Sequence, residues 1–331
     1  MSKILVTGGT GFLGRFIIDR LIREKFRIRA LVRNPNHHAI KDWGNHVEVV
    51  KGDILDIPSL DSAMEGITHV IHSAATVSFH KKEHQLMKLV NETGTANVVN
   101  LCLEKGVQRL VHVSSVSALG RTDKNEIMNE NTKWQDSPLN TFYAKTKYLA
   151  EKQVYRGIEE GLNAVICSPS MIMGYGDWNL GTPKMFSMIY SGFPFYPVGK
   201  NGFVGAVDVA EAIRIFLDAP NVIGKKYILS QTNWTYKQLF DTIAFALNKP
   251  APKWKIPKTL SLTYGSITEF FGEILNKPSL VTKETALTSS LDFQYDGSLV
   301  TKELGLVYTP LDIILKETAA LFLQENVMNS K

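Results

Sequence analysis

The sequence predicts an α/β protein: a doubly wound parallel sheet with helices on both faces, followed by a smaller C-terminal α/β domain. Short apolar segments alternate with longer stretches of helical periodicity as far as residue 168. The first apolar segment leads into a glycine-rich turn and then a helix. After residue 168 the chain becomes rich in Met, aromatic residues, Gly and Pro. We therefore expect one domain over 1–168 and a second mainly over 169–331, with segments near 203–230 returning to the first.

The glycine-rich turn is the strongest local motif. It joins an apolar strand, Ile4–Val6, to an amphipathic stretch, Phe12–Lys25. Two overlapping patterns cover it, G-x-G-x-x-G from Gly9 and G-x-x-G-x-x-G from Gly8. In this context the motif predicts a dinucleotide site of the Rossmann type, because glycine lets the backbone approach a pyrophosphate and helical N–H groups meet the phosphates. The expected contacts are Gly8, Thr10, Gly11, Phe12, Leu13 and Gly14.

Composition restricts the class of protein and its partners. With 331 residues, 44% of them hydrophobic, the chain can form a large core. The net charge of +5 is spread without a Lys/Arg block, which argues against a nucleic-acid partner. The first strand begins almost at Met1 and no uncharged apolar run reaches about 18 residues, so we expect neither a signal peptide nor a membrane-spanning segment. Cys102 and Cys167 lie in apolar stretches without disulfide or metal spacing, which predicts buried thiols and a cytoplasmic protein.

The second strand indicates which dinucleotide binds. Arg27–Val32 reads as this strand, and it ends at Arg33, where NAD-binding proteins place an acidic residue for the ribose 2′-hydroxyl. An arginine there suits the 2′-phosphate of NADP, helped by the nearby His37, His38 and Lys41. The alternative is a solvated Arg at a strand end. We expect NADP, with NAD as the second choice.

The third strand, Val47–Val50, ends in a short polar turn that contains Asp53 and Ile54. This turn lies at the carboxyl edge of the expected sheet, where ligands bind in such folds. Asp53 would accept from the adenine amino group and Ile54 would lie beside it. Helix capping, by Asp56 ahead of a proline, is an equally good use of a local acid.

The fourth strand, His69–Ser73, runs into Ala74 and Ala75. Small residues there let the backbone pass close to a cofactor, so we include both alanines in its site. His72 is better explained as a packed strand residue than as a catalyst.

The remaining elements of the first domain continue the alternation. We expect a helix over 84–105, a strand Arg109–Val113 ending in Ser114-Ser115, a turn-rich loop over 120–138, a helix Leu139–Gly157 and a strand Asn163–Cys167.

A Tyr-x-x-x-Lys pair lies on the helix Leu139–Gly157. The spacing puts Tyr143 and Lys147 on one face, one turn apart. A phenol has a pKa near 10, and a nearby ammonium is expected to lower it, which suits general acid–base chemistry. Ser115, at the carboxyl end of the fifth strand, can orient a substrate oxygen toward Tyr143. The pair is common by chance on helices, and its value here comes from the strand ending in Ser-Ser and the glycine turn.

The part of the chain after Ser168 supplies the expected substrate pocket. Met171–Pro197 is rich in Met and aromatic residues, which suits both the core of a small domain and an apolar pocket wall. The stretch Ile256–Leu275 is amphipathic and aromatic-rich, and we expect it to pack on the small domain rather than on a membrane surface. The other expected elements are helices over 207–217, 235–247 and 309–324 and a strand over 226–229.

Taken together, the motifs resemble those of the extended short-chain dehydrogenases/reductases, the NAD-dependent epimerase/dehydratase superfamily, and the resemblance covers nearly the whole chain. They are TGGTGFLG at 7–14, GDILD at 52–56, HSAA at 72–75, NETGTANVV at 91–99, VSSVSALG at 113–120, YAKTKYLAE at 143–151, SPSMIMGYGD at 168–177 and FVGAVDVAEAI at 203–213.

The resemblance assigns roles to individual residues. It implies that Ser115, five residues before Gly120, is the catalytic serine, with Ser114 as the fallback. It also implies that Tyr143 transfers the proton and that Lys147 is its partner and holds the nicotinamide ribose. The further cofactor contacts that it implies are Asn91, on the nicotinamide side, and Pro169 and Ser170, at the nicotinamide end. Family members often form homodimers through a four-helix bundle, here made by the helices 84–105 and 139–157.

Two branches of the family compete. VRNP at 32–35 and YAKTKYLAEK at 143–152 resemble the dihydroflavonol-reductase and 3β-hydroxysteroid-dehydrogenase branch, which acts on fairly apolar ketones and secondary alcohols. Nucleotide-sugar epimerases and dehydratases clamp a diphosphate, usually with C-terminal arginines. After Arg156 this chain has only Arg214, and Asn201-Gly202-Phe203 stands where epimerases typically have an Arg. A single aspartate, Asp208, stands where many members have a pair, although Lys184 and Lys200 remain as anion contacts.

The sequence therefore predicts an NADP(H)-dependent oxidoreductase that interconverts a small-molecule ketone or aldehyde and an alcohol, with Tyr143 as the general acid/base. The alternative is a nucleotide-sugar epimerase/dehydratase with tightly bound NAD. A third hypothesis is a non-catalytic NADP-sensing module, but such proteins commonly lack the Tyr/Lys pair.

Overall fold

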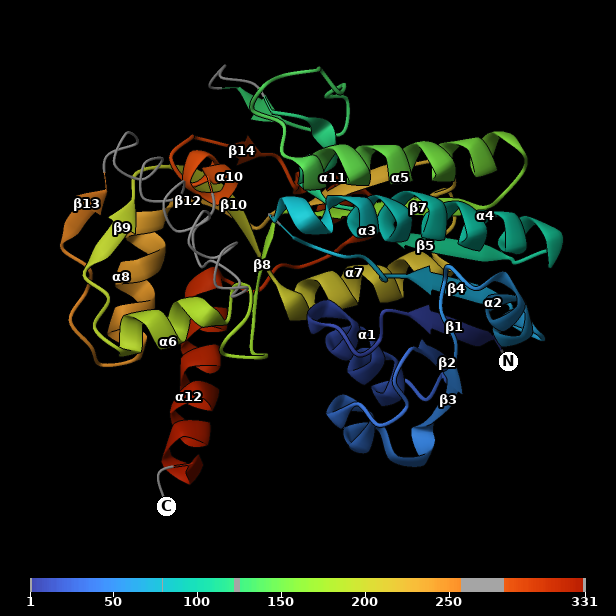
Figure 1. Ribbon diagram of the computed structural model, residues 1–331, viewed down its shortest axis with the longest axis horizontal. Helices are drawn as coiled ribbons and strands as arrows, with labels where there is room; N and C mark the ends of the chain where they lie inside the picture. The colour runs from blue at the N-terminus through green and yellow to red at the C-terminus, as the bar shows by residue number, and fades with distance from the viewer. Residues whose placement is uncertain (1, 79, 122–125, 257–282, 330–331) are drawn as a thin grey trace.

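The computed structural model describes residues 2–78, 80–121, 126–256 and 283–329 (Figure 1). Its centre is a seven-stranded sheet in the order β11-β7-β5-β4-β1-β2-β3, and every neighbouring pair is parallel. The strands are β1 (Lys3–Thr7), β2 (Arg27–Val32), β3 (Val47–Lys51), β4 (His69–His72), β5 (Arg109–Val113), β7 (Ala164–Pro169) and β11 (Lys226–Leu229). The order reverses between β1 and β4, which is where doubly wound sheets bind ligands. The predicted fold class is confirmed.

Helices cover both faces of this sheet (Figure 1). Two helices, α1 (Phe12–Arg23) and α7 (Ala206–Asp218), pack side by side on one face and share an apolar core with the strands. The other face carries α2 (Ile57–Met64), α4 (Gly94–Glu104) and α5 (Phe142–Glu159), which form a second core. Burial of apolar residues on both faces is what a parallel sheet with crossover helices requires.

The helix expected over 84–105 is continuous in space but not uniform. It consists of α3 (His84–Lys88), the π-helical turn η3 (Leu89–Thr93) and α4. The 3-10 segment η2 (Lys81–Glu83) precedes it; two others, η1 (His38–His46) and η4 (Val116–Leu119), lie before β3 and after β5. A π turn adds one residue to the helical repeat and often marks a functional position. Here it contains Asn91.

The C-terminal part builds smaller sheets at one end of the main sheet (Figure 1). A three-stranded sheet has the order β12-β10-β8, and two further sheets pair β13 with β9 and β14 with β6. Their strands are β8 (Met171–Met173), β9 (Phe195–Pro197), β10 (Lys200–Gly205), β12 (Thr232–Thr235), β13 (Trp254–Ile256), β6 (Ile127–Met128) and β14 (Gln294–Tyr295). The helices of this part are α6 (Lys184–Tyr190), α8 (Tyr236–Ala246), α10 (Lys283–Thr288), α11 (Ser298–Leu304) and α12 (Leu311–Asn329).

The structure differs from the sequence expectations mainly where strands are short. The segment 120–138, expected as a loop, contains β6, whose partner β14 comes more than 160 residues later. The Met- and aromatic-rich segment places Met173, Phe186 and Ile189 in the core of the smaller sheets. The predicted amphipathic stretch from residue 257 to 275 lies outside the described residues.

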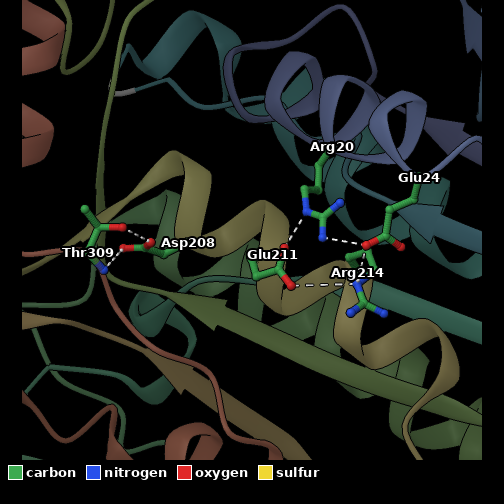
Figure 2. Close-up of polar contacts among 6 residues, drawn as sticks. All are labelled: Arg20, Glu24, Asp208, Glu211, Arg214 and Thr309. Atoms are coloured by element: carbon green, nitrogen blue, oxygen red, sulfur yellow. Dashed lines mark hydrogen bonds and ion pairs between the residues drawn. The ribbon is translucent and has the colours of Figure 1, made fainter.

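Polar contacts tie α7 to its neighbours (Figure 2). Arg20 on α1 donates to Glu211 on α7 and to Glu24, and Arg214 Nε lies 3.5 Å from Glu24 Oε1 and 3.7 Å from Glu211 Oε1. Arg214 is therefore engaged between α1 and α7. At the other end of α7, Asp208 accepts hydrogen bonds from Thr309, just before α12.

Candidate active site

The turn between β1 and α1 has no room for a side chain at two of its glycines. Gly8 adopts φ +74°, and a Cβ there would lie 2.6 Å from the backbone nitrogen of Ala74. A Cβ on Gly14 would lie 2.0 Å from the carbonyl oxygen of Gly8. Gly11 stands at the N-cap of α1, and no side chain caps its N–H groups. Open N–H groups at a helix N-terminus, with glycine on both sides, fit a dinucleotide pyrophosphate.

The end of β4 is fastened against this turn. The hydroxyl of Thr7 accepts from the backbone nitrogen of Ala74 at 3.3 Å and lies 2.8 Å from His72 Nδ1. His72 Nε2 lies 3.0 Å from the hydroxyl of Thr95, so both ring nitrogens have partners. Burial lowers the pKa of His72 to about 3. His72 is thus a neutral, packed strand residue, as the sequence predicted, while Ala75 lies exposed next to the turn.

The residues expected at the adenosine end lie at the ends of β2 and β3. Arg33 is exposed immediately after β2, close in sequence to the stacked rings of His37 and His38. Asp53 is half-buried, and its Oδ1 accepts from the backbone nitrogen of Leu55 at 3.0 Å. The Asp53 side chain thus closes a turn within its own loop. Asp56 stands at the N-cap of α2 but makes no capping hydrogen bond with its side chain.

Two buried residues of the predicted cofactor site have structural contacts. Ile54 is 5% exposed and lies under Gly94, where an added Cβ would meet its Cδ1 at 2.5 Å. Asn91 is buried, and its Oδ1 accepts from the backbone nitrogen of Thr76 at 2.8 Å. Its Nδ2 donates to the carbonyl of Thr76 at 2.9 Å and to the hydroxyl of Thr146 at 3.0 Å. Asn91 therefore anchors the segment after β4 to α5, the helix that carries Tyr143 and Lys147.

The two serines after β5 point in different directions. Ser114 is buried and donates to Glu151 Oε1 at 2.6 Å. Ser115 caps η4 by accepting from the backbone nitrogen of Ser117, and its side chain lies close enough to the phenol of Tyr143 to lower the pKa of that phenol. The geometry therefore brings Ser115, and not Ser114, to the phenol.

The phenol of Tyr143 is held in its protonated form. Burial raises its pKa to about 12, and the hydrogen bond with Ser115 and the charge of Arg121 offset part of that rise. This is opposite to the direction expected from the sequence. The cation that acts on Tyr143 here is Arg121 rather than Lys147, because the Lys147 ammonium donates to the carbonyl of Val113 at 2.8 Å. Burial lowers the pKa of Lys147 to about 8, against the opposing charge of Glu151.

Ser170 and Pro169 lie where the seven-stranded sheet meets the smaller one. Pro169 ends β7, and Ser170 donates its backbone N–H to the carbonyl of Leu229 at 2.9 Å. Within the described residues the buried hydroxyl of Ser170 has no hydrogen-bond partner. An added Cβ on Gly202 would lie 3.1 Å from Ser170 Cβ, so a larger residue at 202 would crowd this end of the site.

Two residues near the Tyr/Lys pair escaped the sequence analysis. Arg121 is half-buried, with its guanidinium over the ring of Phe293, 5.3 Å from the ring centre. A signal for it was present, since it directly follows the Gly120 that locates Ser115. Glu151 continues the one-turn spacing from Tyr143 and Lys147, and the structure buries it. Charged residues on a helix usually face solvent, so spacing alone could not show its burial.

The described residues contain neither a cluster arranged to hold a metal ion nor a helix able to span a membrane. Across the described ranges, no group of three or more His, Cys, Asp or Glu side chains is arranged to hold a metal ion. None of the helices in those ranges has both the length and the apolarity needed to cross a bilayer.

Comparison with known proteins adds three relatives. Residues 5–209 match the 3-beta hydroxysteroid dehydrogenase/isomerase family. The chain is 27% identical, over 96% of its length and 98% of the relative's, to the 3 beta-hydroxysteroid dehydrogenase/Delta 5→4-isomerase of Vaccinia virus. It is 30% identical to tetraketide alpha-pyrone reductase 2 of Arabidopsis thaliana, over 68% of this chain and 77% of that protein. The crystal structure of gox2253 superposes with a TM-score of 0.83 at 29% identity, covering 98% of this chain and 99% of that one.

Proposed function

Because the chain belongs to the 3-beta hydroxysteroid dehydrogenase/isomerase family, we propose that it is an NADP(H)-dependent oxidoreductase that interconverts a ketone or aldehyde and an alcohol on a fairly apolar substrate. The class of NAD(P)-dependent enzymes acting on CH–OH groups follows from the family. The observation that supports the chemistry best is the position of the Ser115 side chain beside Tyr143, whose pKa it lowers, with Lys147 one turn further along α5. Ser115 follows the carboxyl end of β5, and Lys147 donates to the carbonyl of Val113 at that same end. Because the strands are parallel, this end lies on the side of the sheet where β1 leads into the glycine turn.

In the proposed reaction Tyr143 gives its phenolic proton to the carbonyl oxygen during reduction and takes it back during oxidation. Ser115 hydrogen-bonds the same oxygen and fixes its direction relative to the phenol. Lys147 would hold the nicotinamide ribose, and the positive charge of Arg121 favours the phenolate that forms as the proton leaves Tyr143. When bound, the nicotinamide cofactor supplies or accepts the hydride. The close packing of backbone around Gly8 and Gly14 supports the assignment of its pyrophosphate to the glycine turn.

The epimerase alternative requires cations for a diphosphate. Arg214 is the only arginine after Arg156, and it lies between α1 and α7 with Glu24 and Glu211 (Figure 2). Lys200 donates to Gln294 Oε1 at 2.8 Å. This distribution of cations favours a reductase or dehydrogenase over an enzyme that clamps a nucleotide sugar.

Replacement of the phenol tests the proposal directly. We expect Tyr143→Phe to lower turnover at least about 100-fold, since it removes the proton donor but keeps the ring. The assay is nicotinamide absorbance over a panel of ketones, aldehydes and alcohols, with Tyr148→Phe on the same helix as the matched control. Near-normal turnover by Tyr143→Phe would reject the assignment. Product formation without net change in nicotinamide would point to an epimerase instead.

Preference for NADP is tested at Arg33. A charge-assisted contact with the 2′-phosphate contributes about 1.5–3 kcal/mol, so Arg33→Ala should raise the KM for NADPH roughly 10- to 100-fold. The KM for NADH should stay within about twofold. Arg27→Ala, at the exposed amino end of the same strand, is the control. Faster turnover of the wild type with NADH than with NADPH would contradict this role for Arg33.

Three further predictions go with this proposal. The chain would work as a homodimer through the helices 84–105 and 139–157, where Leu86, Leu89 and Tyr155 expose apolar surface. It would be cytoplasmic. Residues 169–331 would mainly bind substrate, and the expectation of a substrate pocket in Met171–Pro197 stays a prediction. Light scattering of the purified protein measures the first of these.

A further inference from the structure

A buried carboxylate lies behind the proposed catalytic pair. The side chain of Glu151 is 3% exposed, and its Oε2 lies 2.5 Å from Lys226 Nζ, whose side chain is 11% exposed. Its Oε1 accepts from the hydroxyl of Ser114 at 2.6 Å and from that of Ser168 at 3.4 Å. These contacts come from three elements, the end of β5, β7 and β11, and join them to α5, which carries Glu151.

Such a group is costly for a protein to keep. Burial of two charges loses their hydration, and apolar residues of similar volume often stabilise a core as well or better. The serines and the lysine satisfy this carboxylate, but they do not explain why a carboxylate is there. Its position suggests a reason, because Glu151 follows Lys147 by one helical turn on the same face of α5.

Lys147 has few other sources of negative charge. Tyr143 on its own helix is protonated, and His72 on β4 and His112 on β5 are buried and neutral. The thiol of Cys167 on β7 is buried, and burial raises its pKa, so it too is neutral. Lys226 on β11 carries the same charge as Lys147. Among the described groups that raise the pKa of Lys147, Glu151 has the largest effect.

We propose that Glu151 is a positioning residue that keeps Lys147 protonated, and that Lys226 limits this effect by sharing the carboxylate. The proposal rests on the proposed function, in which Lys147 holds the nicotinamide ribose. Lys147 would then lose its proton close to working pH, and the charge pair behind it would set the pH at which the cofactor site weakens. Glu151 touches neither substrate nor cofactor in this role.

The test measures the affinity for NADPH against pH, by NADPH fluorescence, on the full chain without substrate. In the wild type we expect affinity to fall as the pH rises through about 8, as Lys147 becomes neutral. In Glu151→Gln this fall should begin about one pH unit lower, because the neutral amide cannot stabilise the ammonium. Glu151→Asp keeps the charge and should restore most of the wild-type profile. Glu160→Gln removes the same charge from the exposed end of α5 and should change nothing.

For Lys226→Met we expect a shift in the opposite direction of the pH at which the affinity for NADPH falls. This substitution removes the cation that pairs with Glu151, so more of the negative charge of the carboxylate acts on Lys147, and the fall in affinity should begin at higher pH than in the wild type. A structural role alone predicts loss of affinity at every pH in both variants, and shifts of opposite sign would exclude it. The proposal is overturned if Glu151→Gln titrates like the wild type, or if Lys226→Met shifts in the same direction. If Glu151→Gln does not fold, the sign of the Lys226→Met shift decides alone.

The two proposals can fail separately. Binding of NADPH requires no knowledge of the substrate, so this titration is informative even if the panel of carbonyl compounds yields no turnover. If Tyr143→Phe keeps near-normal turnover while Glu151→Gln and Lys226→Met shift as expected, the proposed chemistry fails and the role of Glu151 stands.

Discussion

His112 lies in the centre of β5, and within the described residues neither of its ring nitrogens has a hydrogen-bond partner. Its ring tilts over that of His72, with 5.3 Å between the ring centres. Burial lowers the pKa of His112 well below the 6.5 of a free histidine, and the charge of Lys147 adds to this. A histidine that stays neutral when folded but takes up a proton when unfolded favours unfolding in acid. Its contribution to stability is therefore complete above pH 6.5 and is lost as the pH falls below that value.

Replacement of this imidazole tests that sign. From pH 6.5 down to pH 5 the wild type should lose about 1.4 kcal/mol of unfolding free energy per pH unit for each such histidine. His112→Leu removes one of them, so its stability should fall less steeply with acid. At pH 7 it should match or exceed the wild type, because no hydrogen bond is lost. Urea unfolding at several pH values measures both. His46→Leu, at an exposed histidine, should keep the wild-type slope, and an unchanged slope in His112→Leu would contradict the argument.

At the scale of the element, the turn from β1 into α1 combines a strained backbone with close packing. Gly8 requires a positive φ, and Gly14 lies against the backbone of Gly8 rather than against a side chain. Gly9 differs, because a Cβ there would meet the flexible end of Ile18 at 2.6 Å. A side chain at Gly14 is therefore opposed by backbone, whereas one at Gly9 is opposed only by a side chain that can move. Substitution of each by alanine should show this difference.

Gly14→Ala should weaken NADPH binding at least about tenfold, because its Cβ displaces the backbone of the turn and overpacking of this kind costs about 1–3 kcal/mol. Gly9→Ala should have a smaller effect, since Ile18 can move. Calorimetric titration with NADPH measures both, and circular dichroism checks that each variant is folded. Equal losses in the two variants would mean that the contact with Gly8 is not what matters.

On the scale of the whole molecule, α7 connects the large sheet to the C-terminal part (Figure 2). Asp208 is buried at its first turn, and its Oδ2 and Oδ1 accept from the backbone nitrogen and the hydroxyl of Thr309 at 3.1 and 2.8 Å. Burial raises the pKa of Asp208, and the hydrogen bonds from Thr309 offset part of that rise. Further along α7, the contact of Glu211 with Arg20 is partly exposed, and such pairs contribute little.

Asp208→Ala should lower the unfolding free energy by about 2 kcal/mol, because it leaves two donors of Thr309 without their partner in a buried place. Glu211→Gln on the same helix should cost less than about 1 kcal/mol. Thermal and urea unfolding compare the two. A larger loss in Glu211→Gln than in Asp208→Ala would show that the surface pair, and not the buried contact, connects these parts.

The sequence by itself determined the parallel α/β fold, the alternation of strands and helices along the chain, and the glycine turn. The strands β2 and β5 begin and end where the apolar pattern predicted. The reason is that the apolar pattern of a strand and the turn residues that bound it lie within a few positions of each other in the sequence. The capping box of Thr235 and Gln238 starts α8 at the beginning of the helix expected over 235–247. The Tyr143 and Lys147 pair could be recognised from the sequence for the same reason, because its two members lie one helical turn apart.

Only the tertiary structure decided what surrounds that pair. The pairing of β6 with β14, the engagement of Arg214 with α1, and the contact of Lys226 with Glu151 join residues at least 75 positions apart. Nothing in a local pattern carries such information. The pKa of Tyr143 is the clearest case: spacing predicted a lowered value from Lys147, but burial by distant segments raises it. The cost of desolvation depends on what the whole chain packs around a group, and one helix cannot reveal it.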